Sequence, residues 1–312
     1  MKEYRKLSRT DYIRVANYYY NHGLTQEQIA VNMDLSRQRI NRVLSKCLED
    51  GIVKIYVEGV DETNIELENT LEKMYNLKNV RVSNASSKED IYIEIGKLAA
   101  KYLAKIIKNG DIIGFSRGRS ISALVDYMPS AKYTEITITQ LMGGCNNQQS
   151  KVNIDDIVHR FAQRTDAESS LLFAPVVVNS PEVKQAIMKE PFFIETYNII
   201  KSCTIAVVGI GDATYEPDIS SINKEQVVYD STKVPVGEIC THHFSSNGDP
   251  IKTSLDERII AVDREDFLKI PTRIGVAGSK MKVPAIIGAI RGGYINTLIT
   301  DSETATVLSQ SS

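Results

Sequence analysis

The chain has 312 residues and nearly balanced charge, with 37 Lys and Arg against 39 Asp and Glu. This length is enough for two domains, and a net charge of −2 excludes a polycationic nucleic-acid coat or an acidic tail protein. No apolar run approaches the roughly 20 residues that span a bilayer, and the four cysteines are widely separated. Residues 1–9 are polar and charged, so we expect no secretory leader. We therefore expect a cytoplasmic protein with reduced thiols and no membrane partner.

Positive charge is concentrated in the N-terminal part of the chain. Residues 1–57 contain ten basic and six acidic residues, a net charge of +4, whereas the remaining 255 residues carry 27 basic and 33 acidic ones, a net charge of −6. A polar stretch at residues 58–64 separates the two parts. We predict a first domain at 1–57, a linker at 58–64 and a second domain at 65–312. Only the first domain would attract a polyanion such as DNA.

The first domain shows the start and stop signals of three short helices. A helical pattern over Tyr12 to Tyr20 ends near Gly23, where glycine allows a left-handed backbone. Thr25 to Gln28 forms a capping box, which predicts a second helix to about Asn32. Ser36 can cap a third helix with the apolar stripe Ile40, Val43, Leu44, Cys47 and Leu48. Two short helices joined by a tight turn are typical of a helix-turn-helix.

The face of the third helix opposite the apolar stripe is polar and basic. Arginine pairs with guanine and glutamine with adenine through two hydrogen bonds each, so we predict base contacts for Arg37, Gln38 and Arg42. A solvated helix face is the alternative, as is an adaptor whose helix-turn-helix contacts protein instead of DNA.

Phosphate contacts are expected from hydroxyl and cationic side chains around these base-reading residues. An alternating pattern over Val53 to Val57 predicts a short strand, a possible wing that places Lys54 near the DNA backbone. The full predicted set of DNA-binding residues is Thr25, Gln26, Ser36, Arg37, Gln38, Arg39, Arg42, Lys46 and Lys54.

The second domain alternates strand-like and helical patterns. Strands are predicted at 79–82, 111–115, 135–141, 169–173, 204–208, 273–276 and 296–299, with helices at 91–107, 120–128 and 153–163 among them. Such alternation predicts an α/β fold with a doubly wound, mainly parallel sheet covered on both faces. Ligands of such sheets bind outside the carboxyl ends of the strands.

Glycine-rich segments follow several predicted strands at this edge. They are Gly114 to Ser120, Gly143 to Cys145, Gly209 to Gly211 and Gly278 to Lys280. Glycine lets backbone N–H groups approach an anion, and a following helix adds its positive end, so a phosphate or polyol would fit. A plain strand-to-helix connection is the alternative for any one loop. No Walker A or GxGxxG pattern occurs, so we predict no nucleotide cofactor.

Signals of catalysis are weak. The four histidines, His22, His159, His242 and His243, lack zinc-site spacing, and no GxSxG elbow occurs. The four cysteines, Cys47, Cys145, Cys203 and Cys240, are interpreted as buried small hydrophobic residues. We predict neither a metal site nor an enzyme.

The residues quoted next resemble one bacterial family. The segment from Tyr18 through Leu24-Thr25-Gln26-Glu27-Gln28 to Gly51 resembles the helix-turn-helix of the SorC family of sugar-responsive transcriptional regulators. Gly110 to Arg119 resembles its first sugar loop, and Gly275-Val276-Ala277-Gly278, Lys282 and Gly292 to Ala305 resemble its C-terminal signature. The resemblance extends over essentially the whole chain.

This resemblance implies a fold akin to sugar-phosphate isomerases and deaminases in the second domain, which would bind an effector and form a dimer or tetramer. It places the effector at Ser116, Arg117, Gly118, Arg119, Ser120, Gly143, Gly144, Gly209, Gly211 and Lys282. Arg117 stands where relatives often have an aromatic residue, and Met142 with Cys145 leaves the second loop without a lysine. The sequence of the first loop resembles sorbose-type members most, so the expected effector is a ketose, a polyol or its phosphate.

We therefore expect a DNA-binding regulator of a carbohydrate catabolism operon. Its partners would be duplex operator DNA, a small sugar, polyol or sugar phosphate, and further copies of itself. The alternative is a sugar-phosphate isomerase or deaminase with an accessory DNA-binding head, which would need a general acid and base on the loops.

Overall fold

The computed structural model describes residues 7–55, 64–84, 91–144, 152–213, 228–229 and 234–311. The chain divides into two compact units, Met1–Asp61 and Glu62–Ser312. We call them the head and the effector unit and describe each by itself. The division falls within residues 58–64, which the sequence marks as a linker and of which 58–63 lie outside the described residues.

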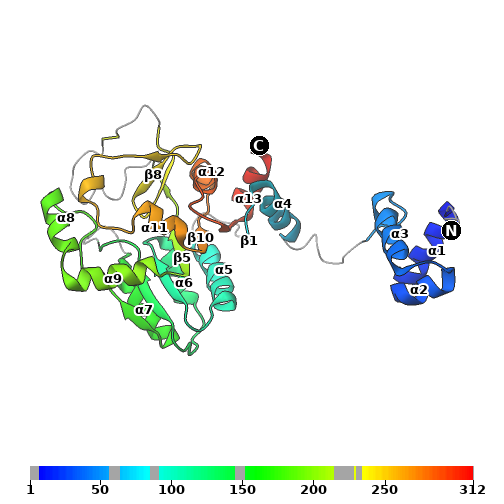
Figure 1. Cartoon of the computed structure of the whole chain (residues 1–312). Coiled ribbons are helices and arrows are strands. Elements are labelled where there is room, and N and C mark those ends of the chain that lie inside the picture. The colour runs from blue at the N-terminus through cyan, green and yellow to red at the C-terminus, as the bar shows by residue number, and fades with distance from the viewer. Residues whose placement is uncertain are drawn as a thin grey trace. The chain divides into compact units, whose positions relative to one another are not determined.

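The head contains three helices, α1 (Arg9–Tyr20), α2 (Gln26–Met33) and α3 (Arg37–Glu49) (Figure 1). α1 begins three residues before its predicted start, because Ser8 and Asp11 form a capping box in which the Ser8 N–H donates to the Asp11 carboxylate at 2.9 Å. Thr25 and Ser36 cap α2 and α3 as predicted.

A tight turn and a small core hold α2 against α3. Asp34 adopts a left-handed conformation with φ of 50°, and the Leu35 N–H donates to the Ala30 carbonyl at 2.9 Å. Apolar side chains of all three helices then meet in one buried cluster, whose members are Val15, Ala16, Ile29, Ala30, Ile40, Val43, Leu44 and Cys47. The arrangement is a helix-turn-helix supported by α1.

The strand predicted over Val53 to Val57 is wrong in its described part. Residues 51–55 contain no strand. The Val53 N–H instead donates to the Cys47 carbonyl at 2.9 Å near the end of α3, and Ile52 and Val53 pack against the helical core. No neighbouring strand is present among the described residues of the head, so the alternating pattern has nothing to pair with. Tyr56 and Val57 lie outside the described residues.

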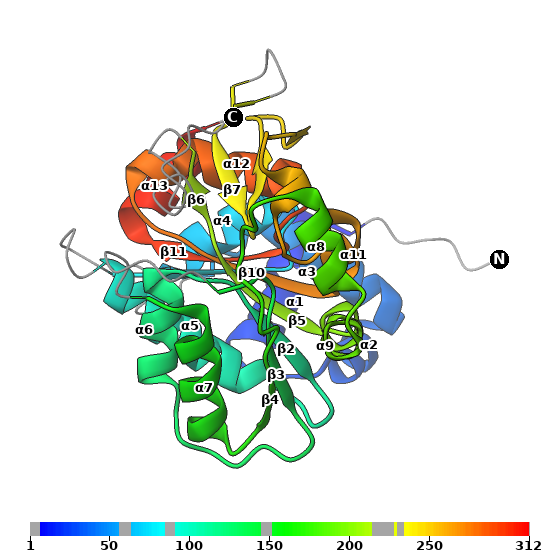
Figure 2. The same cartoon turned by 90° about the vertical axis from the view of Figure 1, so that its left-hand side faces the viewer.

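The effector unit is built on a seven-stranded parallel sheet, which confirms the predicted fold class (Figure 2). Its strand order is β1-β11-β10-β5-β2-β3-β4. The strands are β1 (Asn79–Ser83), β2 (Ile112–Phe115), β3 (Thr137–Gln140), β4 (Glu168–Ser170), β5 (Ile205–Gly209), β10 (Thr272–Val276) and β11 (Thr297–Asp301).

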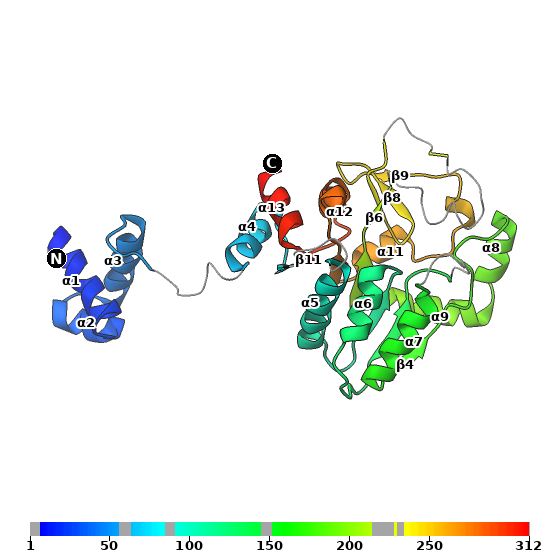
Figure 3. The same cartoon turned by 180° about the vertical axis from the view of Figure 1, so that it is seen from behind.

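Helices cover both faces of this sheet. On one face lie α5 (Ile91–Ile106), α6 (Arg119–Tyr127) and α7 (Ile154–Thr165), side by side in Figure 3. The other face carries α9 (Pro191–Lys201) and α11 (Arg264–Lys269) (Figure 2). Side chains of β5 alternate accordingly, because Val207 belongs to the core under α5 to α7 whereas Ala206 and Val208 belong to the core on the opposite face.

The remaining elements surround the sheet. α4 (Ile65–Tyr75) lies beside α13 (Ser302–Gln310) (Figure 1). α8 (Pro181–Met188), α12 (Val283–Arg291) and the short helices η2 (Asp256–Arg258) and η3 (Lys280–Lys282) connect other strands. An antiparallel sheet that the sequence did not predict has the order β6-β7-β8-β9, with bounds Gly211–Asp212, Gly237–Ile239, His242–Phe244 and Pro250–Ile251.

Several strands are shorter than predicted. β4 ends at Ser170, and Phe173, the predicted last residue, has φ of 45°, which does not belong to a strand. β3 begins at Thr137 instead of Glu135, which has φ of 61°. No helix within the described ranges is long and apolar enough to cross a membrane.

Candidate DNA-binding and effector sites

The predicted DNA-binding face of α3 is open to solvent. Gln38, Arg42 and Lys46 are exposed, and Arg39 is half-buried at the edge of the helix. The opposite stripe is buried through Ile40 and its apolar neighbours in the helix. The local sequence folds in this way because the Ser36 hydroxyl accepts the Arg39 N–H at 3.3 Å and starts the helix at Arg37.

Polar contacts tie the start of α2 to α3. The Thr25 hydroxyl accepts the Gln28 N–H at 3.3 Å, so its role in the described structure is to cap α2. Gln26 Nε2 donates to Asn41 Oδ1 at 3.3 Å, which places Gln26 beside α3. Arg37 forms an ion pair with Glu27 at 3.1 Å, with both side chains about two-thirds exposed at 67% and 64%. An exposed pair contributes about 0–1 kcal/mol, so Arg37 can leave it for a nucleic acid at little cost.

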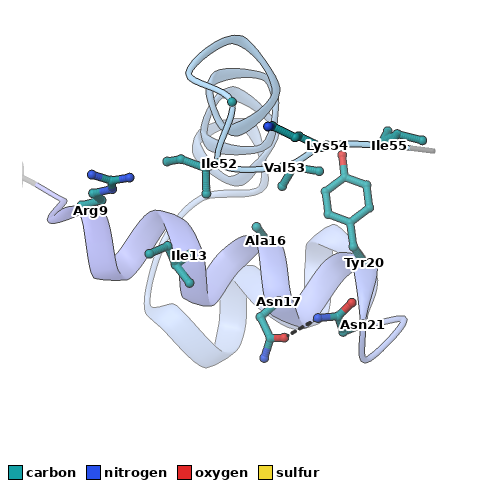
Figure 4. Close-up of a pocket in the computed structure, with 11 residues that line it drawn as sticks. Arg9, Ile13, Ala16, Asn17, Tyr20, Asn21, Ile52, Val53, Lys54 and Ile55 are labelled. Carbon is teal, nitrogen blue, oxygen red and sulfur yellow. Dashed lines mark hydrogen bonds between the residues drawn. The ribbon is translucent and has the colours of Figure 1, made fainter.

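A groove of about 660 Å³ lies in the head between α1 and the segment after α3 (Figure 4). Ile52 and Val53 lie over Ile13 and Ala16 of α1. Lys54 lines this groove, whereas no residue of α3 does.

At the carboxyl edge of the sheet, the loops after β2 and β5 meet. The Ser116 hydroxyl accepts the Gly209 N–H at 3.0 Å, and the Ser116 N–H donates to the Val207 carbonyl at 3.0 Å. A Cβ built on Gly118 would lie 3.9 Å from the Cα of Gly209, so the two chains approach closely. Ser116, Gly118 and Gly209 are thus brought together as predicted for one site.

Lys282 approaches the same loops from η3. Its Nζ donates to the Ile210 carbonyl at 2.7 Å. Burial of the amine lowers the pKa of Lys282, and the nearby positive charge of Arg119 lowers it further, while Glu238 and Asp212 oppose this. The site therefore holds a desolvated cation close to a second cation, and an anion at this position would be stabilised by both.

Arg119 is held at the start of α6. Its guanidinium donates to the Tyr92 hydroxyl at 2.7 Å and stacks over the Tyr92 ring at 3.9 Å from the centroid. Gly118 is the N-cap residue of α6 and Ser120, in the first turn, is buried. Since glycine has no side chain to cap the helix, α6 begins at this edge of the sheet without a side-chain cap, at the positive end of its dipole.

Gly143 and Gly144 have a different local role. The Gly143 N–H donates to the Ile260 carbonyl at 2.9 Å, and the Gly144 N–H to the Ala174 carbonyl at 2.8 Å. A Cβ on Gly143 would lie 2.6 Å from the Ala174 oxygen. Both amides donate to neighbouring backbone and so do not point at an anion, and Gly143 is required for the close approach of a second chain segment.

The structure adds residues that sequence reasoning missed. Glu238 lies beside Gly211, where a Cβ would be 2.5 Å from its Oε1, and its charge acts on Lys282. Tyr92 positions Arg119 from α5. Both lie far from the glycine-rich loops in sequence, and no local motif marks them.

Cysteine and histidine take part in ordinary packing. Cys47, Cys203 and Cys240 are buried free thiols, and burial raises the pKa of Cys203 to about 12. His242 Nε2 lies 2.7 Å from the Val262 carbonyl oxygen, and burial lowers the pKa of His242. Cys145 lies outside the described residues. Among the residues that the structure describes, no group of His, Cys, Asp or Glu could hold a metal ion.

A helix-turn-helix head joined to a parallel α/β unit with a cationic, glycine-lined edge defines the class of ligand-responsive transcription factors. The family described as "Putative sugar-binding domain" matches residues 61–309. The chain is 28% identical over 306 residues to the sorbitol operon regulator of Klebsiella pneumoniae, covering 95% of this chain and 96% of that protein. It is also 28% identical over 304 residues to the erythritol catabolism regulatory protein EryD of Brucella abortus (strain 2308), covering 95% of each.

Solved structures agree with these relatives. The crystal structure of the full-length sorbitol operon regulator SorC from Klebsiella pneumoniae matches with a TM-score of 0.73 at 28% identity, covering 96% of this chain and 98% of that one. A probable sor operon regulator from Shigella flexneri matches with a TM-score of 0.70, also at 28% identity, covering 78% of this chain and 99% of that one. The chain belongs to this sugar-binding family, in its SorC type, and is a transcriptional regulator of the carbohydrate-operon class.

Proposed function

We propose that the head binds duplex operator DNA and that a small sugar, polyol or sugar phosphate in the crevice of the effector unit controls this binding. The observation that carries the proposal is the meeting of Lys282, Arg119 and the Ser116 hydroxyl with glycine-rich backbone. Two cations and a helix N-terminus favour an anion, while hydroxyl and backbone groups suit the hydroxyls of a sugar.

A phosphorylated effector fits this chemistry better than a neutral one. Lys282 is half-buried, and its amine donates to a neutral acceptor in the described structure, the Ile210 carbonyl. A phosphate would add negative charge to that of Glu238 and Asp212 and so compensate the desolvation of the amine further. The relatives named for sorbitol and erythritol make open-chain polyols and their phosphates the first candidates.

A soluble regulator that acts as a dimer or tetramer in the cytoplasm is part of the proposal. Two helix-turn-helix heads reading half-sites about one helical turn apart would follow from such an assembly. The competing proposal of an isomerase or deaminase makes a separate prediction, which is turnover of a sugar phosphate observable by NMR. Unchanged spectra after prolonged incubation with the candidate sugar phosphates would exclude this second activity for them.

Gel-shift and fluorescence-anisotropy titrations with fragments of the chain's own promoter region test the proposal. They are run without effector, with sorbitol 6-phosphate, with fructose 6-phosphate and with the unphosphorylated sugars. A thermal-shift screen in parallel identifies ligands, since a ligand at 100 times its Kd adds about 2.7 kcal/mol of stability. We expect binding of at least one fragment and a change with a phosphosugar. Absence of any fragment binding under all conditions would refute the proposed function.

A further inference from the structure

The helix that follows the linker is fastened to an edge of the seven-stranded sheet by three side chains. Asn64, Glu68 and Glu72 are spaced four residues apart and lie on one side of α4. Asn64 Nδ2 donates to the Val82 carbonyl at 3.0 Å. Glu68 and Glu72 accept the N–H groups of Val82 and Val80 at 2.9 and 2.8 Å. Because β1 is the last strand at this edge, α4 fills the place of a further strand.

The carboxyl end of β1 lies beside a fully buried carboxylate. The parallel register of β1 and β11 places Ser83 opposite Asp301. Asp301 is 0% exposed, and its Oδ2 accepts the Ser279 N–H at 3.0 Å and the Thr304 hydroxyl at 2.6 Å. The Ser279 N–H is also 2.9 Å from the Thr304 hydroxyl oxygen. Asp301 is therefore a clamp on the loop after β10.

This clamped loop carries Lys282. Ser279 has φ of 103°, a conformation that side chains rarely adopt, and its hydrogen bonds hold it there. The Lys282 N–H donates to the Ser279 carbonyl at 2.9 Å. A Cβ on Gly278 would lie 2.5 Å from Asp301 Oδ2, so the loop packs directly on the carboxylate. A displacement of Lys282 by a ligand would therefore act on Asp301.

We infer that Asp301 and Asn64 are positioning residues that connect the effector crevice with the end of the linker. The inference rests on the proposed function, because it assigns the route by which that crevice acts. Asp301 couples the Lys282 loop to β11, and β1 follows β11 because five register pairs join the two strands. Asn64 then couples β1 to the residue at which the linker ends.

Asn64 is the residue whose replacement can interrupt the connection between the Lys282 loop and the linker with least damage to the fold. Its side chain is half-buried and, among the described residues, donates to the Val82 carbonyl and to Asn84 Oδ1 at 2.6 Å. Glu68 and Glu72 still hold α4 on β1 when Asn64 is removed. Loss of Asn64 should therefore separate ligand binding from response.

Hydrogen exchange on the full-length chain tests the connection without a ligand. Thr304→Val removes the hydroxyl that braces Ser279 and Asp301, and Asp301→Asn weakens the clamp further. We expect faster exchange in residues 278–282 and also in residues 65–72, by about threefold or more. Thr139→Val, which removes an equally buried hydroxyl from β3, is the control and should leave 65–72 unchanged. Faster exchange confined to 278–282, or no change in either segment, would overturn the inference.

Asn64→Ala tests the functional step, with Asn69→Ala as the matched control at an exposed position of the same helix. Affinity for a promoter fragment is measured with and without sorbitol 6-phosphate, with inorganic phosphate as a second probe. Asn64→Ala should bind probes and DNA like the wild-type protein, but its response should fall from the roughly 5–150-fold typical of allosteric coupling to within about twofold. A full response would overturn the inference. A wild-type protein that binds no fragment refutes the proposed function instead, and hydrogen exchange then decides on Asn64 and Asp301.

Discussion

Arg42 occupies the exposed face of α3, one turn beyond the capped start of the helix. We expect Arg42→Ala to weaken binding to the cognate operator by about 1–3 kcal/mol and to relax specificity at one base pair, because a bidentate contact to guanine is lost. Lys46→Ala provides the comparison, since losing a phosphate contact should weaken all sequences alike and reduce the salt dependence by about one unit of slope. Anisotropy titrations on operator variants measure both. An equal loss of affinity for all operator variants on Arg42→Ala would identify Arg42 as a phosphate contact instead.

Lys282 makes effector binding depend on pH. Because burial lowers the pKa of its amine, part of the ligand-free protein has neutral Lys282 at alkaline pH. A bound phosphate would favour the charged amine and raise this pKa, so binding above neutral pH should take up a proton. Calorimetry in buffers of different ionisation enthalpy measures that uptake.

Lys282→Met is the matching variant. It should abolish the proton uptake and weaken phosphosugar binding by about 1.5–3 kcal/mol, the value of a hydrogen bond to a charged group. Promoter binding without effector should be retained. An unchanged calorimetric affinity would remove Lys282 from the effector site.

The contribution of Glu68 to the free energy of unfolding changes with pH in the opposite direction to that of an ordinary salt-bridged carboxylate. Burial raises its pKa, although the Val82 N–H and Arg81 lower it in part. Its contribution to the free energy of unfolding is therefore greatest below the unfolded pKa and is lost as pH rises through the folded pKa. Glu68→Gln can keep the acceptor for Val82 without this cost, so its stability relative to wild type should improve as pH rises from about 4 to 7. Urea unfolding with Glu66→Gln as control tests this; a pH-independent difference would contradict it.

At the scale of elements, the capping box of α2 holds the helix that supports α3. The Thr25 hydroxyl accepts the Gln28 N–H, and Gln28 Oε1 accepts the Thr25 N–H at 2.9 Å. We expect Thr25→Ala to destabilise α2 by about 0.5–2 kcal/mol. Hydrogen exchange of residues 26–33 measures the effect, with Ser45→Ala on the exposed face of α3 as control. Equal exchange in the two variants would show that the cap is not needed.

The head helices could be predicted from sequence because their signals are local. Ser36 and Thr25 mark helix starts that depend only on side chain and backbone within three residues. The strand predicted from Val53 onward was wrong because a strand depends on a distant partner strand. The alternating pattern does not indicate whether such a partner exists. The strand predicted to reach Phe173 failed because Phe173 has a left-handed backbone with φ of 45°, which a bulky residue rarely adopts and which no sequence pattern indicates.

The effector site could be predicted only in part. Glycines after strands point to the carboxyl edge of the sheet, where the structure brings Ser116, Gly118 and Gly209 together, because parallel strands place their carboxyl ends at the same edge. Two kinds of glycine could not be told apart, those such as Gly209 that face Ser116 and those such as Gly143 that only admit neighbouring backbone. Glu238 and Tyr92 were missed because strand order and helix packing, not sequence neighbours, bring them to the site.

At the scale of the whole molecule, charge is divided between the units. The head carries the net positive charge and the effector unit the negative one, so DNA binding should depend steeply on salt through the head alone. We expect a phosphosugar to change the free energy of operator binding by about 1–3 kcal/mol without changing the salt slope. The effector would alter the fraction of protein molecules whose conformation can bind DNA, and not the number of phosphate contacts that a bound head makes. Titrations at several salt concentrations measure both quantities. A slope that changes with effector would instead mean that the ligand removes individual contacts.

Covering of β1 by α4 also bears on self-association. A bare terminal strand offers its N–H and C=O groups to any other chain and can seed aggregates. Glu68 and Glu72 occupy the Val82 and Val80 amides, and their negative charge repels an incoming copy. Replacing both with alanine would uncover a Val-rich ribbon, and such a protein should precipitate during expression or storage even where its folded stability is little changed.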